Sequence, residues 1–463
     1  MKTKNMIAIR VLVVVMGFPV VLPLIAEART LKLACGGQRT ITAVVEKLNP
    51  GDTLLIEGSC VENVLIPEQV ADVIIDGQGA ATINGPDATK ATITVRGRNI
   101  TIQNFHSITG GRDGVQVNRG GTAIITNNII QNTGNSGVDV GSGGFAAIVL
   151  NTIQNNLESG ITINNSSSAN IGFVAVTDTT GGPNTIQNNG SSGITVTQSA
   201  SARIEGNTIS GNASGGITII ENSNARIGFR SGSPGTFSAP NLIQKNEGSG
   251  ILVSRSSSAR ITGNTISNNT DGGIVVNDSA TAEISPEEGV SGGSNTITGN
   301  GGAGANARDG VFVGRSSSAA IENNTISNNT RDGIRIIRAS QVDVSGNTIN
   351  SNGGDGIFVI ENSGVNIDAA NSTTSNNTGF GLRCLRGSYA SGTVTTGGSG
   401  TAADRLSGNL GVKSFGATLT VTVAQGTGNT TFGPVADADG TTATITPTGT
   451  VPINSQGCID NTN

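Results

Sequence analysis

The chain has 463 residues, of which 68 are Gly, 35% are apolar and 13% are charged. The apolar content excludes a disordered polyampholyte, and an ordinary globular chain of this length would divide into two or three domains. An elongated repeat body escapes that division, because each unit buries its surface against its neighbours. The net charge of −5 disfavours nucleic acid and anionic membranes as partners.

Residues 1–28 have the pattern of a secretory signal peptide. Basic residues precede the apolar run 11–25, and Ala26-Glu27-Ala28 is a small-x-small cleavage pattern. An uncleaved N-terminal anchor is the alternative, but the run is short for a membrane span. Removal of residues 1–28 changes the net charge from −5 to −7. We therefore expect a secreted, periplasmic or extracellular protein without a transmembrane segment after cleavage.

Export makes the four cysteines interpretable as disulfides. They form two widely separated pairs, which favours Cys35–Cys60 and Cys384–Cys458 among three connectivities. Free buried thiols are the alternative. Residues 29–110 are predicted to form an N-terminal cap and the first coils, with a short helix in 40–48. Predicted strands in this region are 53–56, 61–66, 73–75, 93–95 and 100–102.

Residues 111–385 repeat with a period of 23 residues. A G-[IVL]-x-[VI] tetrad starts at ten glycines, and intervals of 33, 34 and 37 residues interrupt the period. These glycines are Gly114, Gly137, Gly160, Gly193, Gly216, Gly250, Gly273, Gly310, Gly333 and Gly356. An aliphatic residue follows each Gly by eleven positions, and an N-x-I triplet follows wherever the interval is 23.

Alternation of apolar and polar residues predicts strands rather than helices. Three short strands per 23 residues describe one coil of a parallel β-solenoid, in which each strand pairs with its equivalent about 4.8 Å away. The Asn of N-x-I forms a predicted column of stacked amides that bond from coil to coil. Its members are Asn128, Asn151, Asn207, Asn264, Asn324 and Asn347.

The pattern N-x-I-x-x-N followed by D-G-I-x-V resembles the right-handed parallel β-helix superfamily with the pectin-lyase-like fold. The resemblance covers about residues 40–385 and implies an all-β, right-handed solenoid of roughly 13 coils, about 60 Å long at the strand spacing. Members include lyases, epimerases, adhesins and a copper-site maturation protein, so the resemblance leaves function open.

Three insertions lengthen alternate coils at the same turn, at 172–183, 228–240 and 285–294. We expect them to project as a ridge beside a flat sheet, which makes a groove suited to a long polymer. The alternative is that the insertions are surface loops without a function. Two of the insertions share Ile-Gly-Phe, which predicts that they pack on the body.

Few residues of the chain suit metal or nucleophilic chemistry. All three Met precede residue 17, His106 is the one His, and the Cys are predicted to be paired. This composition speaks against copper or zinc, and we predict no required cofactor. The G-D-D and His-Gly motifs of the polygalacturonase-like family and the Y-G-x-D-P-H motif of alginate epimerases are absent.

The candidate site is a column of acids with nearby arginines on three consecutive coils. Asp309, Asp332 and Asp355 each precede a tetrad Gly. Stacked carboxylates repel one another unless a cation or an arginine intervenes, so Ca²⁺ is a candidate ligand. Good turn chemistry of Asp-Gly is the alternative explanation. The arginines that accompany these acids, and that an acidic sugar would contact, are Arg308, Arg331 and Arg335.

The outward position of the tetrad adds Arg383 to these arginines. At the same position Leu252, Val275, Phe312 and Phe358 are expected to lie under the C-terminal segment. One edge of the tube is predicted to carry an ion-pair ladder at the fifth position after the tetrad Gly. Its members are Glu221, Arg255, Asp278, Arg315, Arg338 and Glu361.

Residues 386–463 lose the repeat and are rich in Thr and Gly, with predicted strands at 417–424 and 442–446. We expect a β-rich C-terminal cap that protects the open end of the tube. The high regularity of the repeat favours a monomeric, non-catalytic surface or extracellular solenoid that binds glycan or is structural. The alternative is a polysaccharide lyase or epimerase that acts on uronate glycans.

Overall fold

The computed structural model describes residues 27–174, 181–231, 236–286, 293–302, 309–367 and 372–379. It also describes the short stretches 381–384, 388–392, 395–396, 410–412, 420–424, 435–437 and 444–448. Of residues 229–231, 236–238, 384 and those beyond 388 it describes the backbone only. Most of the expected signal peptide, Arg308 and the expected Cys384–Cys458 bridge therefore lie outside the described residues.

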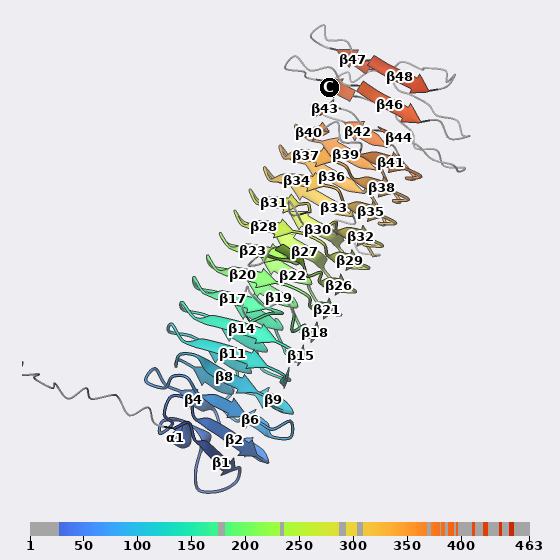
Figure 1. Ribbon diagram of the computed structural model, residues 1–463. Coiled ribbons are helices and arrows are strands. Elements are labelled where there is room, and N and C mark those ends of the chain that lie inside the picture. Colours follow the sequence, from blue (N-terminus) through green and yellow to red (C-terminus); the bar gives the residue numbers. More distant parts are fainter. Residues whose placement is uncertain are drawn as a thin grey trace, which may run out of the picture.

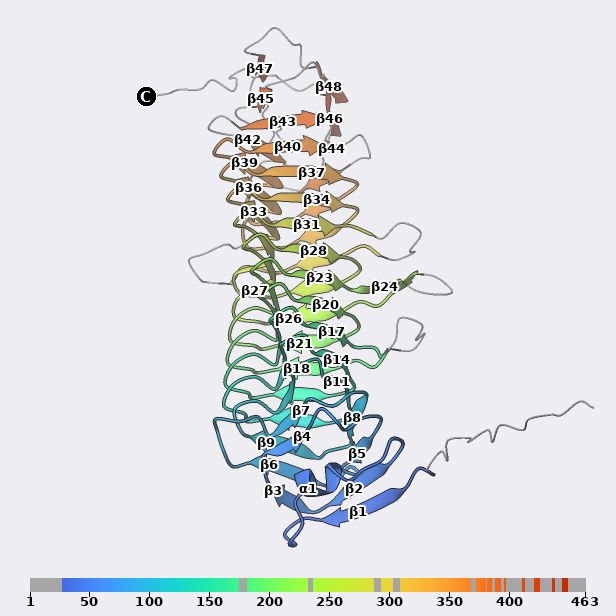
Figure 2. The same ribbon diagram turned by 90° about the vertical axis from the view of Figure 1, so that its left-hand side faces the viewer.

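The described chain winds repeatedly through three parallel sheets, which we name A, B and C, and the coils stack along one axis (Figures 1 and 2). The 15 described strands of sheet A are β1 (Thr30–Ala34), β2 (Thr53–Glu57), β5 (Ile74–Asp76), β8 (Ile100–Gln103), β11 (Thr122–Thr126), β14 (Phe145–Val149), β17 (Ser168–Ile171), β20 (Ser201–Ile204), β23 (Asn224–Ile227), β28 (Ser258–Ile261), β31 (Thr281–Ile284), β34 (Ser318–Glu322), β37 (Gln341–Ser345), β40 (Gly364–Ile367) and β43 (Tyr389–Gly392). The 16 described strands of sheet B are β3 (Ser59–Val61), β6 (Thr82–Gly85), β9 (Ser107–Gly110), β12 (Ile129–Gln131), β15 (Thr152–Gln154), β18 (Thr185–Gln187), β21 (Thr208–Ser210), β26 (Leu242–Gln244), β29 (Thr265–Ser267), β32 (Thr296–Thr298), β35 (Thr325–Ser327), β38 (Thr348–Asn350), β41 (Thr373–Ser375), β44 (Thr395–Thr396), β46 (Thr420–Ala424) and β48 (Thr444–Thr448). The 13 described strands of sheet C are β4 (Val64–Ile66), β7 (Ile93–Val95), β10 (Val115–Val117), β13 (Val138–Val140), β16 (Ile161–Ile163), β19 (Ile194–Val196), β22 (Ile217–Ile219), β27 (Ser249–Val253), β30 (Gly272–Val276), β33 (Val311–Gly314), β36 (Ile334–Ile337), β39 (Ile357–Ile360) and β42 (Leu382–Cys384).

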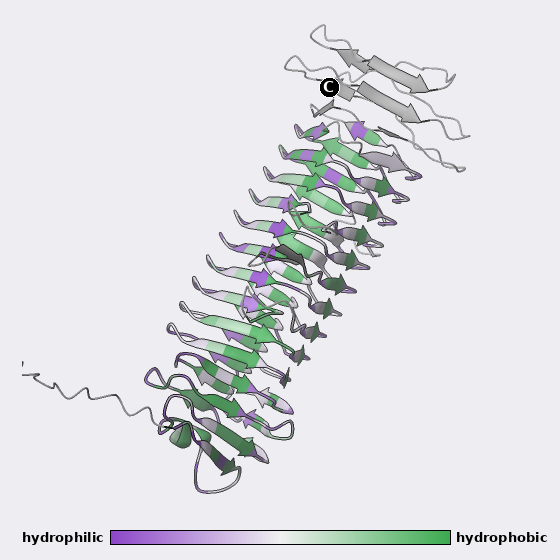
Figure 3. Cartoon of the chain, in the orientation of Figure 1, coloured by the Kyte–Doolittle hydropathy of each residue, from purple (hydrophilic) through white to green (hydrophobic). Residues whose placement is uncertain are grey.

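The core of the tube is a set of aliphatic columns, in agreement with the repeat. Inward residues such as Ile217, Ile227 and Ile243 are fully buried, and apolar colour runs along the strands from coil to coil (Figure 3). The tetrad Gly is required by close packing. A Cβ on Gly333 would lie 2.4 Å from Cγ2 of Ile349 and 2.7 Å from the carbonyl oxygen of Gly356. The backbone at this position therefore lies too close to strand β38 of sheet B and to the next coil to accept any side chain.

Two columns of asparagine hold the turns of the tube. The predicted column lies between sheets A and B, where each Nδ2 donates to the Oδ1 of the next coil, as from Asn207 to Asn241 at 3.1 Å. The sequence analysis missed a second column between sheets B and C, where Asn212 Nδ2 donates to Asn246 Oδ1 at 2.9 Å. Its members are Asn156, Asn189, Asn212, Asn246, Asn269, Asn300, Asn329, Asn352 and Asn377.

The N-terminal end is capped as expected. Helix α1 (Ile41–Val45) begins at its N-cap Thr40 and buries two apolar residues, and the disulfide Cys35–Cys60 joins this region to the first coil. The predicted strand 61–66 is wrong, since β3 ends at 61 and β4 begins at 64. No helix in the described part of the chain has the length and apolar character needed to cross a membrane.

The described C-terminal strands continue the stack. Strands β44, β46 and β48 extend sheet B, while β45 (Leu410–Val412) pairs with β47 (Val435–Asp437). For these described strands, the expectation that the C-terminal segment lies over sheet C is wrong, because parallel pairing to the preceding coil places them at the end of the tube. The outward side chains of sheet C at Leu252 and Phe312 are half-buried.

The second insertion forms a small antiparallel hairpin of β24 (Phe229–Ser231) and β25 (Thr236–Ser238). Strand β24 projects beyond the outline of the tube (Figure 2). In the first insertion Phe173 is buried, with 1% of its surface exposed, which confirms that this Ile-Gly-Phe segment packs on the body. Its Gly172 has a φ of 101°, and a Cβ there would overlap the carbonyl oxygen of Glu205.

Candidate functional site

The three predicted acids come together at the turn that leads into sheet C. Asp309, Asp332 and Asp355 are 1%, 4% and 6% exposed. Asp309 Oδ1 accepts the backbone N–H of Asp332 at 3.1 Å, and Asp332 Oδ1 accepts that of Asp355 at 2.7 Å. The carboxylates of Asp309 and Asp332 therefore point into the turn, and each caps the following coil.

The same geometry recurs where Arg-Asp-Gly first appears. Asp113 Oδ1 accepts the backbone N–H of Ser136 at 3.2 Å, and its Oδ2 lies 2.8 Å from Arg112 Nε. Asp is therefore a turn-capping residue at this position at both ends of the regular tube. This supports the turn-chemistry explanation for the acids, although it does not account for the arginines beside them.

Arg335 and Arg383 lie on the outer face of sheet C, and Arg331 lies in the turn before β36. Arg335 Nη1 is 2.7 Å from Asp332 Oδ2, and Arg383 Nη1 is 3.7 Å from Asp355 Oδ2. Arg331 Nε lies 3.9 Å from Asp309 Oδ1 and 4.0 Å from Asp332 Oδ2. We name Arg331, Arg335, Arg383, Phe312 and Phe358 the arginine patch.

Two guanidinium groups of the arginine patch enclose a ring. Phe312, Arg335, Phe358 and Arg383 are successive register partners on β33, β36, β39 and β42. The Cζ atoms of Arg335 and Arg383 lie 4.5 and 5.3 Å from the centroid of Phe358. Such contacts hold the guanidinium planes in place at the surface. The sequence placed Arg335 and Arg383 on this face but did not identify the ring between them.

Burial, and then the negative charge of Asp332, raise the pKa of Asp309 to about 7, against the opposing effect of Arg331 and Arg335. Its Oδ2 has no hydrogen-bond partner. A protonated Asp309 therefore persists to near neutral pH.

A metal ion is not supported by the described side chains. Within the described residues no group of three His, Cys, Asp or Glu side chains is placed to hold one. The oxygens of Asp332 are engaged by Arg335 and by the N–H of Asp355. Ca²⁺ at these acids stays a prediction, and a calorimetric test of it is given below.

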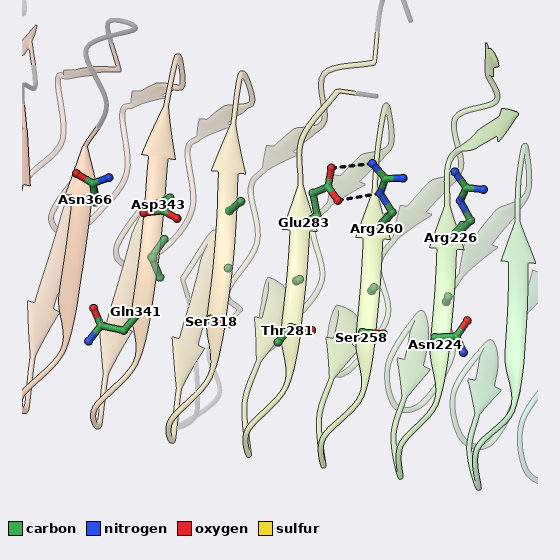
Figure 4. A pocket seen from close by; sticks show the side chains of 16 residues that line it. Asn224, Arg226, Ser258, Arg260, Thr281, Glu283, Ser318, Gln341, Asp343 and Asn366 are labelled. Carbon is green, nitrogen blue, oxygen red and sulfur yellow. Dashed lines mark hydrogen bonds and ion pairs between the residues drawn. The ribbon is translucent and has the colours of Figure 1, made fainter. Parts of the chain in front are cut away.

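A second feature is a groove on the outer face of sheet A, with a volume of about 690 Å³ (Figure 4). It crosses β23, β28, β31, β34, β37 and β40. Two of the three insertions leave sheet A after β23 and β31, which are strands that the groove crosses. The residues that line it are described further below.

The predicted ion-pair ladder is confirmed in three pairs at the opposite border of sheet A. Arg255 Nη1 is 2.9 Å from Glu221 Oε1, and Arg315 Nη1 is 3.0 Å from Asp278 Oδ1. The third pair joins Arg338 and Glu361 at 3.4 Å. All six side chains are well exposed, which limits each pair to about 1 kcal/mol.

Comparison with known families agrees with this architecture. Residues 177–308 and 288–396 match the family described as right handed beta helix region. The chain is a right-handed parallel β-helix of the pectin-lyase-like fold. Residues 50–228 of this β-helix also match the family described as periplasmic copper-binding protein (NosD). Over residues 50–228 the chain has one His and one Cys, and this cysteine, Cys60, is bonded to Cys35, so the described residues of this segment do not fit a copper ion.

Individual relatives match this β-helix at low identity. A cell surface glycoprotein of Methanothermus fervidus is 30% identical over 100 residues, which is 20% of this chain and 16% of that protein. The catalytic domain of Agl-KA is 17% identical with a TM-score of 0.45, over 75% of this chain and 63% of that one. The periplasmic alginate epimerase AlgG is 13% identical with a TM-score of 0.34, over 79% and 83%.

Proposed function

We propose that this β-helix is an exported, non-catalytic protein that binds an acidic polysaccharide through the arginine patch. The signal-like N-terminus supports export, as do the periplasmic description of one matching family and the cell-surface description of one relative. One observation carries the binding proposal. The cluster buries its carboxylates while it exposes the side chains of Arg331 and Arg383 to 42% and 39%, and Arg335 is exposed to 16%.

The chemistry of the patch fits uronate chains. Guanidinium groups bind carboxylates through paired N–H donors, and the half-buried ring of Phe312 offers an apolar face to a sugar. Equivalent positions recur every coil, at about 4.8 Å, so a linear polymer laid along the tube axis meets the arginines in succession. The net negative charge of the rest of the chain confines such a ligand to this face.

Binding without turnover is favoured by the position of the titratable group. Asp309 is 1% exposed, so its carboxyl does not reach a substrate on the outer face. The second candidate, a lyase or epimerase, is favoured by one observation. A carboxyl with a pKa near 7 beside arginines is typical of acid–base sites.

The test is isothermal titration calorimetry of residues 29–463 with hexagalacturonate, at low and high salt. We expect Arg331→Ala combined with Arg383→Ala to weaken binding about tenfold, which corresponds to roughly 1.4 kcal/mol. Arg203→Ala, on the outer face of sheet A, is the matched control and should bind as the wild type. Equal affinity of the double variant and the wild type would remove the patch from the proposal.

Two further measurements separate the alternatives. If the wild type forms unsaturated product from polyuronates and Asp309→Asn does not, the proposal of a binding protein is replaced by that of an enzyme. To test the calcium prediction, the wild type and the double variant Asp332→Ala, Arg335→Ala are each titrated with Ca²⁺ alone. Heats that are the same for both proteins, with an intact fold, would exclude calcium from the acid column.

A further inference from the structure

The groove on sheet A runs between two rows of outward side chains, most of them polar, with the backbone of inward-facing small residues as its floor. Ala225, Ala259, Ala282, Ala319 and Val342 lie in its floor, each at most 7% exposed. The outer rows come from the residues immediately before and after each floor position, which point outward from the strand. The two outward rows thus flank a trough whose floor is the strand backbone at these positions, and the trough runs across six strands, along the tube axis.

The two rows carry complementary hydrogen-bonding groups. The row before the floor has the amides of Asn224 and Gln341, with three hydroxyl side chains between them (Figure 4). The row after the floor has Arg226, Arg260, Glu283 and Asp343 in coil order, interrupted by Ala320. Donors and acceptors therefore face the trough from both sides.

The charges of the groove cancel. Arg260 is bound to Glu283 through two contacts, Nε–Oε2 at 2.8 Å and Nη2–Oε1 at 2.9 Å. Two arginines and two carboxylates line the trough, so it has no excess charge. An acidic polymer that the arginine patch would attract meets Glu283 and Asp343 here and gains nothing from the groove as a whole.

The backbone of sheet A offers no partner to a peptide. Each strand that the groove crosses is paired on both sides, as β28 is with β23 and β31. Extended peptides are recognised by main-chain bonds at an open sheet edge, and the groove runs across strands in the interior of the sheet. Recognition here is left to side chains that recur from coil to coil.

We propose that the sheet A groove binds a neutral, hydroxyl-rich glycan laid along the tube axis. Five steps between coils give the groove a length of about 24 Å at the strand spacing, which suits a chain of several sugar units. Amides, hydroxyls and paired Arg–carboxylate groups are the donors and acceptors that sugar hydroxyls need. This site lies on a different sheet from the arginine patch, so the failure of either proposal leaves the other unaffected.

The experiment uses the full mature chain and three neutral probes, cellohexaose, xylohexaose and mannohexaose, in calorimetric titrations. Ala320→Trp places a large side chain at the one Ala of the row after the floor. The side chain at this position faces solvent, so we expect the fold to stay intact. Ala320→Ser is the matched control. We expect at least one probe to bind the wild type and the Ser variant equally, and to bind Ala320→Trp at least tenfold more weakly.

Further variants distinguish this site from the arginine patch. Gln341→Ala combined with Asp343→Ala should weaken the same probe, whereas Arg331→Ala combined with Arg383→Ala should leave it unchanged. Failure of all three neutral probes to bind the wild type would overturn the proposal. Equal binding by Ala320→Trp and the wild type would overturn it as well, as would loss of hexagalacturonate binding in Ala320→Trp.

Discussion

The buried carboxyl of Asp309 should make the stability of the β-helix fall as the pH rises toward neutrality. Its pKa is raised to about 7 in the folded chain, from an ordinary value of 3.8. Between these two values the folded state holds a proton that the unfolded state has released. The contribution of Asp309 to the free energy of unfolding is therefore most favourable below about pH 4. It decreases through this window and is constant above about pH 7.

Replacement by asparagine removes this dependence. The Asp309→Asn side chain would keep the acceptor for the N–H of Asp332 and would put an uncharged amide where Oδ2 now lies without a hydrogen-bond partner. A shift of three units corresponds to about 4 kcal/mol, the largest gain that Asp309→Asn can give above neutral pH. Near pH 4 the variant and the wild type should be equally stable.

The assay is urea unfolding followed by circular dichroism, at several pH values between about 4 and about 8. Asp278→Asn is the control, because hydrogen bonding to Arg315 lowers the pKa of Asp278 and gives the opposite sign. The reasoning is refuted if the profiles of Asp309→Asn and the wild type run parallel, or if the variant is the less stable protein at about pH 8.

Three further outcomes are expected. Asp278→Asn should lower the free energy of unfolding by at most about 1 kcal/mol near neutral pH. This loss should vanish as the pH falls through the lowered pKa of Asp278 or as salt is added, and denaturation midpoints measure it. Asn207→Leu should lower stability by about 1–3 kcal/mol for each group left unpaired, because the Asn207 amide donates to two carbonyl oxygens and to the next amide of the column. An unchanged thermal unfolding temperature would count against a stabilising role of the column. Reduction of Cys35–Cys60, which closes a separation of 25 residues, should cost about 3 kcal/mol, and an unchanged unfolding midpoint in reductant would contradict this.

The repeat alone was sufficient to predict the coil, the three strands in it and the column from Asn128 to Asn347. A solenoid places residues one period apart side by side, so a period in sequence becomes a column in space. The first coils were harder to predict, since 59–66 contains two short strands with only Glu62 and Asn63 between them. The second asparagine column is the second Asn of the N-x-I-x-x-N pattern, but Asn is also common in surface turns, so the pattern alone did not show that these amides are buried.

The candidate sites depend on tertiary structure to different degrees. The sequence placed Asp309, Asp332 and Asp355 in one column, but only the folded chain shows that all three are buried and that the first two each cap the next coil. Arg383 meets Asp355 from the following coil, 28 residues away in sequence. The groove on sheet A was not predictable residue by residue, because it depends on which outward side chains are small across six coils separated by irregular insertions. Burial and cavity shape are set by the sizes of neighbours in adjacent coils, and the register that brings those neighbours together exists only once the coils have stacked.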